Sequence, residues 1–199
     1  MLNHLRPALV LLLLFTALTG FVYPLAMTGI AKQVFAHQAN GSLVEKDGKV
    51  IGSELIGQNF TAEKYFHGRP SAISGPDPKD ATKTIATPYD ATNSMGSNAG
   101  TTSKALIDRI KGDVENLKKE NPGAPVPADL ATASSSGLDP HISQAAALFQ
   151  MPRVAKARGL GEEQLRKLVS ENTAGRWLGI FGEPVVNVLD LNLALDGLH

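Results

Sequence analysis

The feature that most constrains this chain is a long, uncharged and strongly apolar stretch near its start. No Asp, Glu, Lys or Arg occurs from Pro7 to Ala31, and residues 8–15 read Ala-Leu-Val-Leu-Leu-Leu-Leu-Phe. A bilayer core of about 30 Å needs about 20 helical residues, each rising about 1.5 Å. We therefore predict one transmembrane helix over residues 7–31.

The flanks of this stretch leave one alternative and suggest an orientation. A cleaved secretory signal is the alternative, because residues 34–36 (Val-Phe-Ala) offer a small-residue cleavage site, but signal h-regions span only about 7–15 residues. Arg6 and the α-amino group outnumber Lys32 on the other flank. The positive-inside rule then predicts that residues 1–6 are cytoplasmic and that residues 32–199 form an extracytoplasmic domain.

Composition excludes several classes of function. The 19 basic and 19 acidic residues balance, so the chain lacks the positive surface that binds nucleic acid. It has no cysteine, which excludes disulfides, thiolate metal sites and cysteine nucleophiles. With 199 residues, one anchor and one domain fit the length.

The first part of the domain combines a hairpin, a loop and a helix. Asp47-Gly48 between Val-rich segments predicts a type I′ hairpin over residues 42–56. Residues 71–102 are rich in Gly, Pro, Ser, Thr and Asn, which is typical of a long, flexible loop. Apolar residues at helical spacing predict a helix over residues 103–120.

The second part is predicted to be mostly helical. Asp139 before a proline favours a capped helix over residues 139–149, with further helices over 152–158 and 162–171. Apolar and polar residues alternate over part of 185–195, as in a strand, but Pro184 before the segment and Gly197 after it are typical of a helix. We favour the helix. The predicted fold class is α+β, with one membrane helix.

Motifs for catalysis are weak. There is no G-x-x-x-x-G-K-[ST], G-x-G-x-x-G or Asp-Lys-Thr-Gly motif, so we predict no ATP hydrolysis by the chain alone, and its histidines are too scattered to predict a metal site. The residue types of a serine hydrolase occur in Ser134, Ser135 or Ser136 with Asp139 and His141, but no G-x-S-x-G elbow is present. A serine-rich turn is the simpler interpretation.

Two groups of side chains could serve as contact surfaces. Arg153, Lys156 and Arg158 could form a ligand patch, although a solvated helix face explains them as well. Tyr65 and Phe66, ahead of a Gly-Arg-Pro turn, could anchor a partner or pack into the domain's own core. The sequence leaves this second pair of alternatives open.

Several blocks of the sequence form a recognisable set. In chain order they are residues 65–72 (YFHGRPSA), 96–98 (GSN) with Gly100, 136–143 (SGLDPHIS), 145–147 (AAA) with Gln150, 152–159 (PRVAKARG), 186–189 (VNVL) and 191–196 (LNLALD). Together they resemble the C subunit of the Kdp-type potassium-transporting ATPase. The polar positions that match the family's motifs are Gly68, Arg69, Ser97, Asn98, Asp139, His141, Gln150, Arg153 and Asn187. The resemblance runs along nearly the whole chain.

The resemblance implies a single-pass accessory subunit of a bacterial inner-membrane potassium pump. Its partners would be a P-type ATPase subunit, a channel-like potassium-binding subunit and a small fourth subunit. It would have no cofactor of its own, leave ATP and potassium to the complex, assist assembly and raise the ATP affinity of the ATPase subunit. A membrane-anchored serine hydrolase and a free-standing envelope binding module are the alternatives.

The sequence departs from the family pattern in two places. Residues 73–87 look like an insertion before Tyr89, and Thr101-Thr102-Ser103 replaces the commoner Pro-Thr-Asn. Neither departure touches the later motif blocks, but the first falls within the predicted loop and the second at its end.

Overall fold

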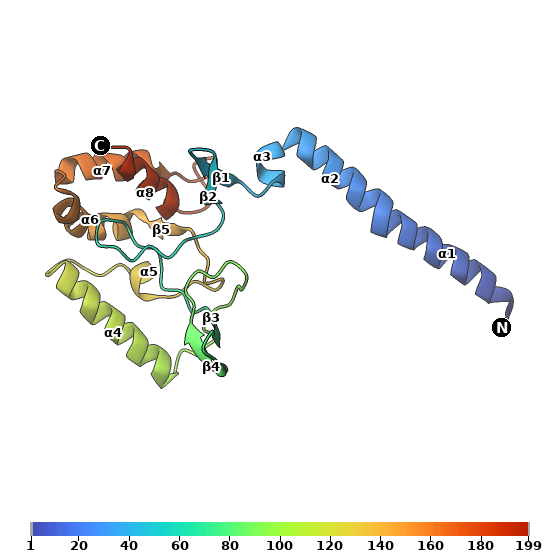
Figure 1. Cartoon of the computed structure of the whole chain (residues 1–199), viewed down its shortest axis with the longest axis horizontal. Coiled ribbons are helices and arrows are strands. Elements are labelled where there is room, and N and C mark those ends of the chain that lie inside the picture. The colour runs from blue at the N-terminus through green and yellow to red at the C-terminus, as the bar shows by residue number, and fades with distance from the viewer. Residues whose placement is uncertain (1, 199) are drawn as a thin grey trace. The chain divides into compact units, whose positions relative to one another are not determined.

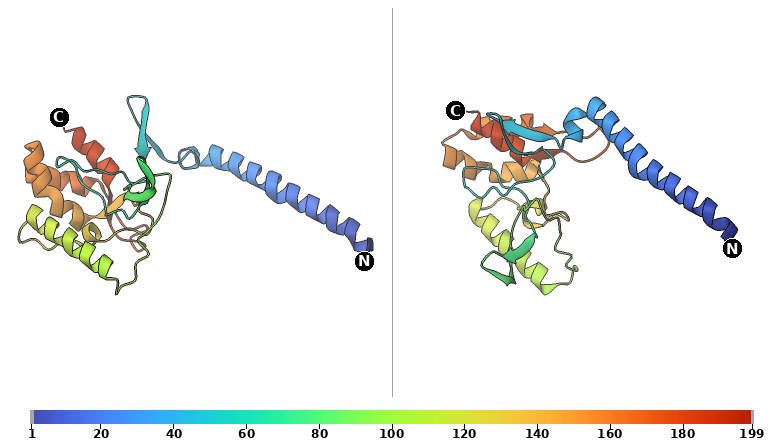
Figure 2. Two further views of the ribbon diagram at one scale, coloured as in Figure 1. Left: turned by 60° about the horizontal axis from the view of Figure 1, so that its bottom comes forward. Right: turned by 45° about the vertical axis from the view of Figure 1, so that its right-hand side comes forward.

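A computed structural model describes residues 2–198, which divide into two compact units, residues 2–53 and 54–198. Figure 1 shows the elements of both units, and Figure 2 gives two further views. The predicted α+β class, with one apolar N-terminal helix ahead of a mixed helix and strand domain, is confirmed.

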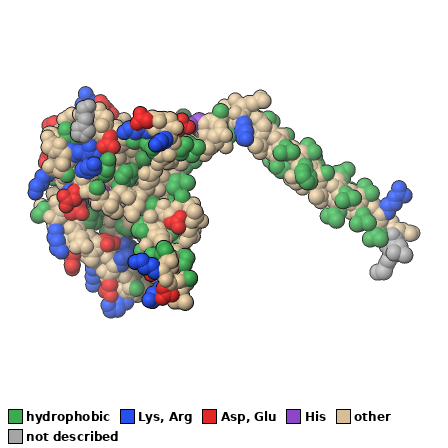
Figure 3. Space-filling view, in the orientation of Figure 1, with side chains coloured by type: hydrophobic (Ala, Val, Ile, Leu, Met, Phe, Trp, Pro, Cys, Tyr) green, Lys and Arg blue, Asp and Glu red, His purple; other side chains and the backbone are tan. Residues whose placement is uncertain are grey.

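The first unit begins with one long apolar helix. A short 3₁₀ turn, η1 (Leu2–His4), leads into α1 (Leu5–Ala17), the π-helical turn η2 (Leu18–Val22) and α2 (Tyr23–Val34). Together they form a 30-residue helix, Leu5–Val34, that is long and apolar enough to cross a membrane and contains the predicted span 7–31. Hydrophobic side chains stand along the visible face of this helix in Figure 3, and none of its residues is buried.

A hairpin follows the helix, as predicted. After α3 (Ala36–Ala39), strands β1 (Leu43–Lys46) and β2 (Lys49–Ser53) pair in antiparallel fashion. Asp47 and Gly48 both adopt positive φ angles, 53° and 73°, as a type I′ turn requires. The prediction of a hairpin within residues 42–56 is therefore confirmed.

The second unit is built on a helical core beside a small sheet. Strands β5 (His141–Ser143), β7 (Val185–Asn187) and β6 (Thr173–Ala174) form an antiparallel sheet in the order β5-β7-β6. Helices α6 (Gln144–Arg158), α7 (Glu162–Glu171) and α8 (Val188–Asp196) contribute most of the core. The largest fully buried side chains include Phe66, Ile142, Leu165, Val169, Val186, Leu191 and Leu195.

The prediction of a continuous loop over residues 71–102 is wrong at its centre. Strands β3 (Ser74–Asp77) and β4 (Asp80–Ala86) form an antiparallel hairpin within the apparent insertion 73–87. β-branched residues in the second strand and a Pro-containing turn make this possible, although most of β4 is exposed. Only Ile73, at the base of the hairpin, is buried.

The helix predicted at residues 103–120 is confirmed, because α4 spans Lys104–Glu120 and the Ser103 side chain caps it. The helix predicted at 162–171 is α7, with Leu165, Leu168 and Val169 buried as expected. A four-residue helix, α5 (Ala128–Ala131), was not predicted.

Two boundaries in the second half were predicted wrongly. Asp139 does not start a helix: residues 141–143 pair with β7, and Ser143 caps α6 instead. Pro152 does not end that helix, which continues to Arg158. The Asn121 side chain donates to the Phe149 carbonyl, 2.9 Å away, in the turn that Pro152 disturbs.

The ambiguous C-terminal segment 185–195 contains both predicted structures. Residues 185–187 form the central strand β7, and Val188–Asp196 form α8. Asn187 makes the switch, because its side-chain oxygen accepts hydrogen bonds from the backbone N–H groups of Leu189 and Asp190. The favoured helix is thus right for 188–196 and wrong for 185–187.

Candidate functional site

Four of the nine motif positions, Gly68, Arg69, Gln150 and Arg153, lie in or bind residues 63–69, a segment outside the helices and strands that we call the strap. Two side-chain amides hold it in place. The Asn192 amide accepts from the Phe66 N–H and donates to the Phe66 carbonyl, both at 2.9 Å. The Gln150 amide does the same for His67, at 2.8 and 3.1 Å. Both residues are 2% exposed, so their amides satisfy buried backbone groups of a segment that belongs to no strand.

Two arginines bind the backbone of the N-terminal half of the strap. Arg153 donates to the carbonyls of Glu63 and Tyr65, and Arg158 donates to the carbonyl of Lys64. Their charges are matched by Glu120, at 3.1 Å from Arg153, and by Asp196 beside Arg158. The two side chains are only 11% and 6% exposed. Neither a ligand patch nor a solvated face describes them: they bind the domain's own backbone.

The two aromatics of the strap belong to the domain itself. Phe66 is completely buried in the core. The Tyr65 ring packs against Phe60 with ring centroids 5.5 Å apart, and its hydroxyl donates to Asp196 at 3.1 Å. The question that the sequence left open is answered in favour of core packing.

Gly68 is required by the approach of Tyr89. A Cβ atom on Gly68 would lie 2.4 Å from the Tyr89 hydroxyl, which donates to the Arg69 carbonyl at 2.7 Å. Burial raises the pKa of Tyr89 to about 12, with the nearby Asp139 carboxylate acting in the same direction. The hydroxyl therefore stays protonated and keeps this hydrogen bond.

A cleft of about 390 Å³ lies between the strap and α4. Its lining residues are Asn59, Phe60, His67, Gly68, Arg69, Pro70, Ser71, Pro88, Tyr89, Arg109, Asp113, Leu117, Glu120, Leu130 and Gln150. Three of the nine motif positions, Gly68, Arg69 and Gln150, face this space. The cleft offers both signs of charge, which suits a polar partner segment.

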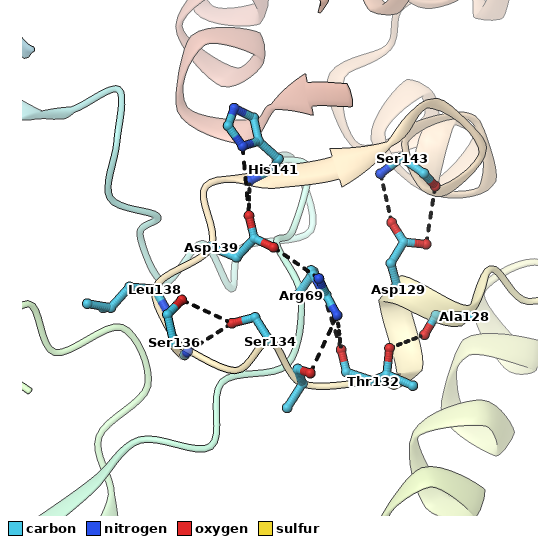
Figure 4. Close-up of polar contacts among 12 residues, drawn as sticks. Arg69, Ala128, Asp129, Thr132, Ser134, Ser136, Leu138, Asp139, His141 and Ser143 are labelled. Atoms are coloured by element: carbon cyan, nitrogen blue, oxygen red, sulfur yellow. Dashed lines mark hydrogen bonds and ion pairs between the residues drawn. The ribbon is translucent and has the colours of Figure 1, made fainter. Parts of the chain in front are cut away.

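Arg69 connects the strap to the serine-rich turn. Its guanidinium donates to Asp139 at 3.0 Å and to the carbonyls of Thr132 and Ala133 (Figure 4). Asp139 also accepts from the backbone N–H of His141, and the His141 ring lies 3.8 Å from the same carboxylate. The three motif residues Arg69, Asp139 and His141 are thus neighbours, as the sequence could not show.

The arrangement needed for a serine hydrolase is not formed. Ser134 and Ser136 accept hydrogen bonds from the N–H groups of Gly137 and Leu138, so they stabilise a turn. In Figure 4 the His141 ring points away from both serines, and Asp139 is engaged by Arg69. In the part of the chain that the structure describes, no His, Asp and Glu side chains cluster in a way that could hold a metal ion.

The remaining motif residues lie elsewhere. Asn187 caps α8 and donates to the Glu54 carbonyl at 2.8 Å, which fixes the start of the second unit. Ser97 and Asn98 form an exposed turn, in which the Ser97 hydroxyl accepts from the Ala99 N–H and Asn98 has a φ of 49°. The structure does not bring these three residues to the cleft.

The lowered pKa of His67 predicts that the stability of the domain depends on pH. Its pKa is lowered chiefly by burial and also by the Arg153 charge, from an ordinary value of 6.5. The unfolded chain therefore takes up this proton at a higher pH than the folded chain does. We expect the free energy of unfolding to fall as pH drops below about 6.5, and His67→Gln to flatten that part of the curve in urea titrations. An unchanged slope in His67→Gln would contradict the assignment.

Comparison with known proteins agrees with this architecture. The sequence model of one family, described as "K+-transporting ATPase, c chain", matches residues 5–197, which include both the apolar helix and the domain. The chain belongs to this family.

Members of the family that resemble the chain include three proteins, each named potassium-transporting ATPase KdpC subunit. The proteins from Bradyrhizobium diazoefficiens and Rhodopseudomonas palustris (strain BisB18) are 66% and 65% identical over 196 residues, which cover 98% of both chains. The protein from Methylobacterium nodulans is 65% identical over 198 residues, covering 100% of this chain and 98% of its own. As a member of the c chain family, the protein is a component of a potassium-transporting ATPase.

Sequence reasoning missed three residues of this c chain's central network. Asn192 sits on the buried face of α8 between Leu191 and Leu195, and an amide on such a face signals a buried backbone partner. Arg158 was interpreted as part of a ligand patch or a solvated face, because it alternates with Arg153 and Lys156 on a short predicted helix. Tyr89 carried no signal, because its role depends on a glycine 21 positions earlier.

Proposed function

We propose that this c chain is a non-catalytic accessory subunit that supports assembly of a potassium import complex and raises the ATP affinity of its ATPase subunit. The observation that carries the proposal is the family match over residues 5–197. The partners are the P-type ATPase subunit, the channel-like potassium-binding subunit and the small fourth subunit that the family resemblance implies. ATP and potassium are handled by those partners, and the chain has no cofactor of its own.

The apolar helix anchors the subunit in the bacterial inner membrane as a single pass. We place its N-terminus in the cytoplasm and residues 32–199 outside, since Arg6 and the α-amino group lie at the start of the helix and only Lys32 lies near its far end. A domain on that side cannot touch a nucleotide in the cytoplasm. Its effect on ATP is then a coupling free energy transmitted through the membrane-embedded partners.

The strap network supports a binding role over a catalytic one. Arg69, Gln150 and Arg153 are occupied by contacts within the domain, and the first two line the cleft beside α4. A cleft with both signs of charge suits a polar loop of a neighbouring subunit. We place that contact at the surface between the strap and α4.

The test compares potassium-stimulated ATPase activity of the purified complex with and without this chain. We expect the apparent KM for ATP to rise about 5- to 150-fold without it, the usual range for allosteric coupling, and adding back the chain to restore it. An unchanged KM would remove the proposed role in ATP affinity. A chain that extracts from the membrane alone would instead favour a free-standing binding module.

The same preparation distinguishes the hydrolase alternative. Ser136→Ala should leave ATPase activity and its KM unchanged, because the Ser136 hydroxyl contacts only its own turn: it accepts from the Leu138 N–H and lies 3.5 Å from the Ser134 hydroxyl. Loss of an esterase activity in this variant would support the hydrolase instead.

A further inference from the structure

The second unit carries a compact apolar projection that the proposed function does not use. Residues 177–181, Trp-Leu-Gly-Ile-Phe, which we call the apolar tip, lie between β6 and β7. Their four large side chains are 69%, 71%, 73% and 58% exposed. Such concentrated apolar exposure on a folded domain marks an interaction site.

The apolar tip is an ordered hairpin turn. The Trp177 N–H donates to the Phe181 carbonyl at 2.8 Å, and the Ile180 N–H donates to the Trp177 carbonyl at 3.1 Å. The rings of Trp177 and Phe181 lie side by side, with centroids 5.7 Å apart. At its base, Arg176 forms a two-pronged ion pair with Glu183, at 2.9 and 2.7 Å. The fold therefore builds this projection and holds its shape.

Leu178 gives a second, independent indication. It has a φ of 52° at the first central position of the turn, where an L-residue with a side chain is strained and Gly or Asn is preferred. Its side chain is 71% exposed, so contacts within the domain do little to offset that strain. A leucine in this place is explained by a contact outside the domain.

The character of the tip favours lipid over protein as that contact. Residues 177–182 carry no charge, and the charges of Arg176 and Glu183 neutralise each other, so nothing offers charge complementarity to a protein face. Four of its five residues have exposed apolar side chains, and lipid chains can contact all of them at once. Tryptophan also prefers the boundary between headgroups and acyl chains.

We propose that the apolar tip inserts into the headgroup–acyl boundary of the phospholipid bilayer that holds helix Leu5–Val34. The inference rests on the membrane anchor of the proposed function, which keeps the domain close to that bilayer and makes insertion effectively intramolecular. The contact adds a second attachment to the membrane at a point remote in sequence from the anchor.

The chain contains a single tryptophan, Trp177, so its fluorescence reports on the apolar tip alone. The full chain is reconstituted into vesicles of phosphatidylcholine and phosphatidylglycerol, with or without brominated acyl chains, and recovered by flotation. We expect Trp177 emission to shift to shorter wavelength, to be quenched by brominated lipid and to be protected from aqueous iodide.

Two variants sharpen the test. Ile180→Ser should reduce the quenching by brominated lipid, whereas Leu55→Ser, a similarly exposed residue at 63%, should leave it unchanged. A floating chain whose Trp177 is open to iodide and unaffected by bromine would overturn the inference and point to a protein partner. A chain that does not float with the vesicles would overturn the membrane anchor, and this inference with it.

Discussion

Asn192→Leu is expected to lower the free energy of unfolding of the domain by about 2–6 kcal/mol, because two buried backbone groups lose their partners and each costs about 1–3 kcal/mol. The leucine fits the apolar face of α8, but it leaves the N–H and carbonyl of Phe66 unsatisfied. Urea titrations of the full chain in mild detergent, followed by far-ultraviolet circular dichroism, measure the change.

Asn116→Leu is the matched control for this variant. Asn116 lies exposed on α4 and only accepts a long hydrogen bond from Lys119. Its replacement should alter stability by no more than about 0.5 kcal/mol, as is usual for surface positions. Equal effects of the two substitutions would show that the Asn192 amide does not hold the strap.

Gly137→Ala is expected to cost about 2–5 kcal/mol, the sum of about 1–2 kcal/mol for a left-handed backbone and about 1–3 kcal/mol for overpacking. Gly137 has a φ of 69°, and a Cβ there would lie 2.5 Å from Ile73 and 2.8 Å from the Met95 carbonyl. The same titrations should show a large fall in the urea midpoint.

Gly112→Ala provides a control of opposite sign. Gly112 lies inside α4, and no atom lies within 4 Å of the position its Cβ would take. Alanine should therefore stabilise the domain by about 0.5–1 kcal/mol through its higher helix propensity. A loss of stability in this variant, or none in Gly137→Ala, would contradict the packing described around the serine-rich turn.

Periodic segments were predictable from the sequence, and their boundaries were less so. Residues 104–120 show one clear apolar face, so local pattern sufficed. Asp139 failed as a helix cap because the pairing of residues 141–143 with β7, about 45 positions later, overrides the local preference. Similarly, Pro152 lies within a helix that buried neighbours on both sides keep intact.

The candidate site was predictable as a set of residues but not as an arrangement. Family blocks named Arg69, Asp139, Gln150 and Arg153, and internal hydrogen bonding was one interpretation of Gln150 and Arg153, but the blocks did not indicate which groups these side chains bind. A hydrogen bond between Gln150 and His67 joins residues 83 positions apart, and no periodicity encodes such a pair. Tyr89 is similar, since a close approach to a distant glycine leaves no local pattern.

The dependence of the strap on α8 sets an order for biosynthesis. The Phe66 backbone binds Asn192, 126 residues later, and Tyr65 and Arg158 both bind Asp196, close to the C-terminus. A growing polypeptide therefore cannot close this domain until its last helix has left the ribosome. The emerging chain stays unfolded until then, which is the state that a translocation channel requires of a polypeptide passing through it. Loss of the final dozen or so residues would remove the side chains that hold residues 65 and 66 in place.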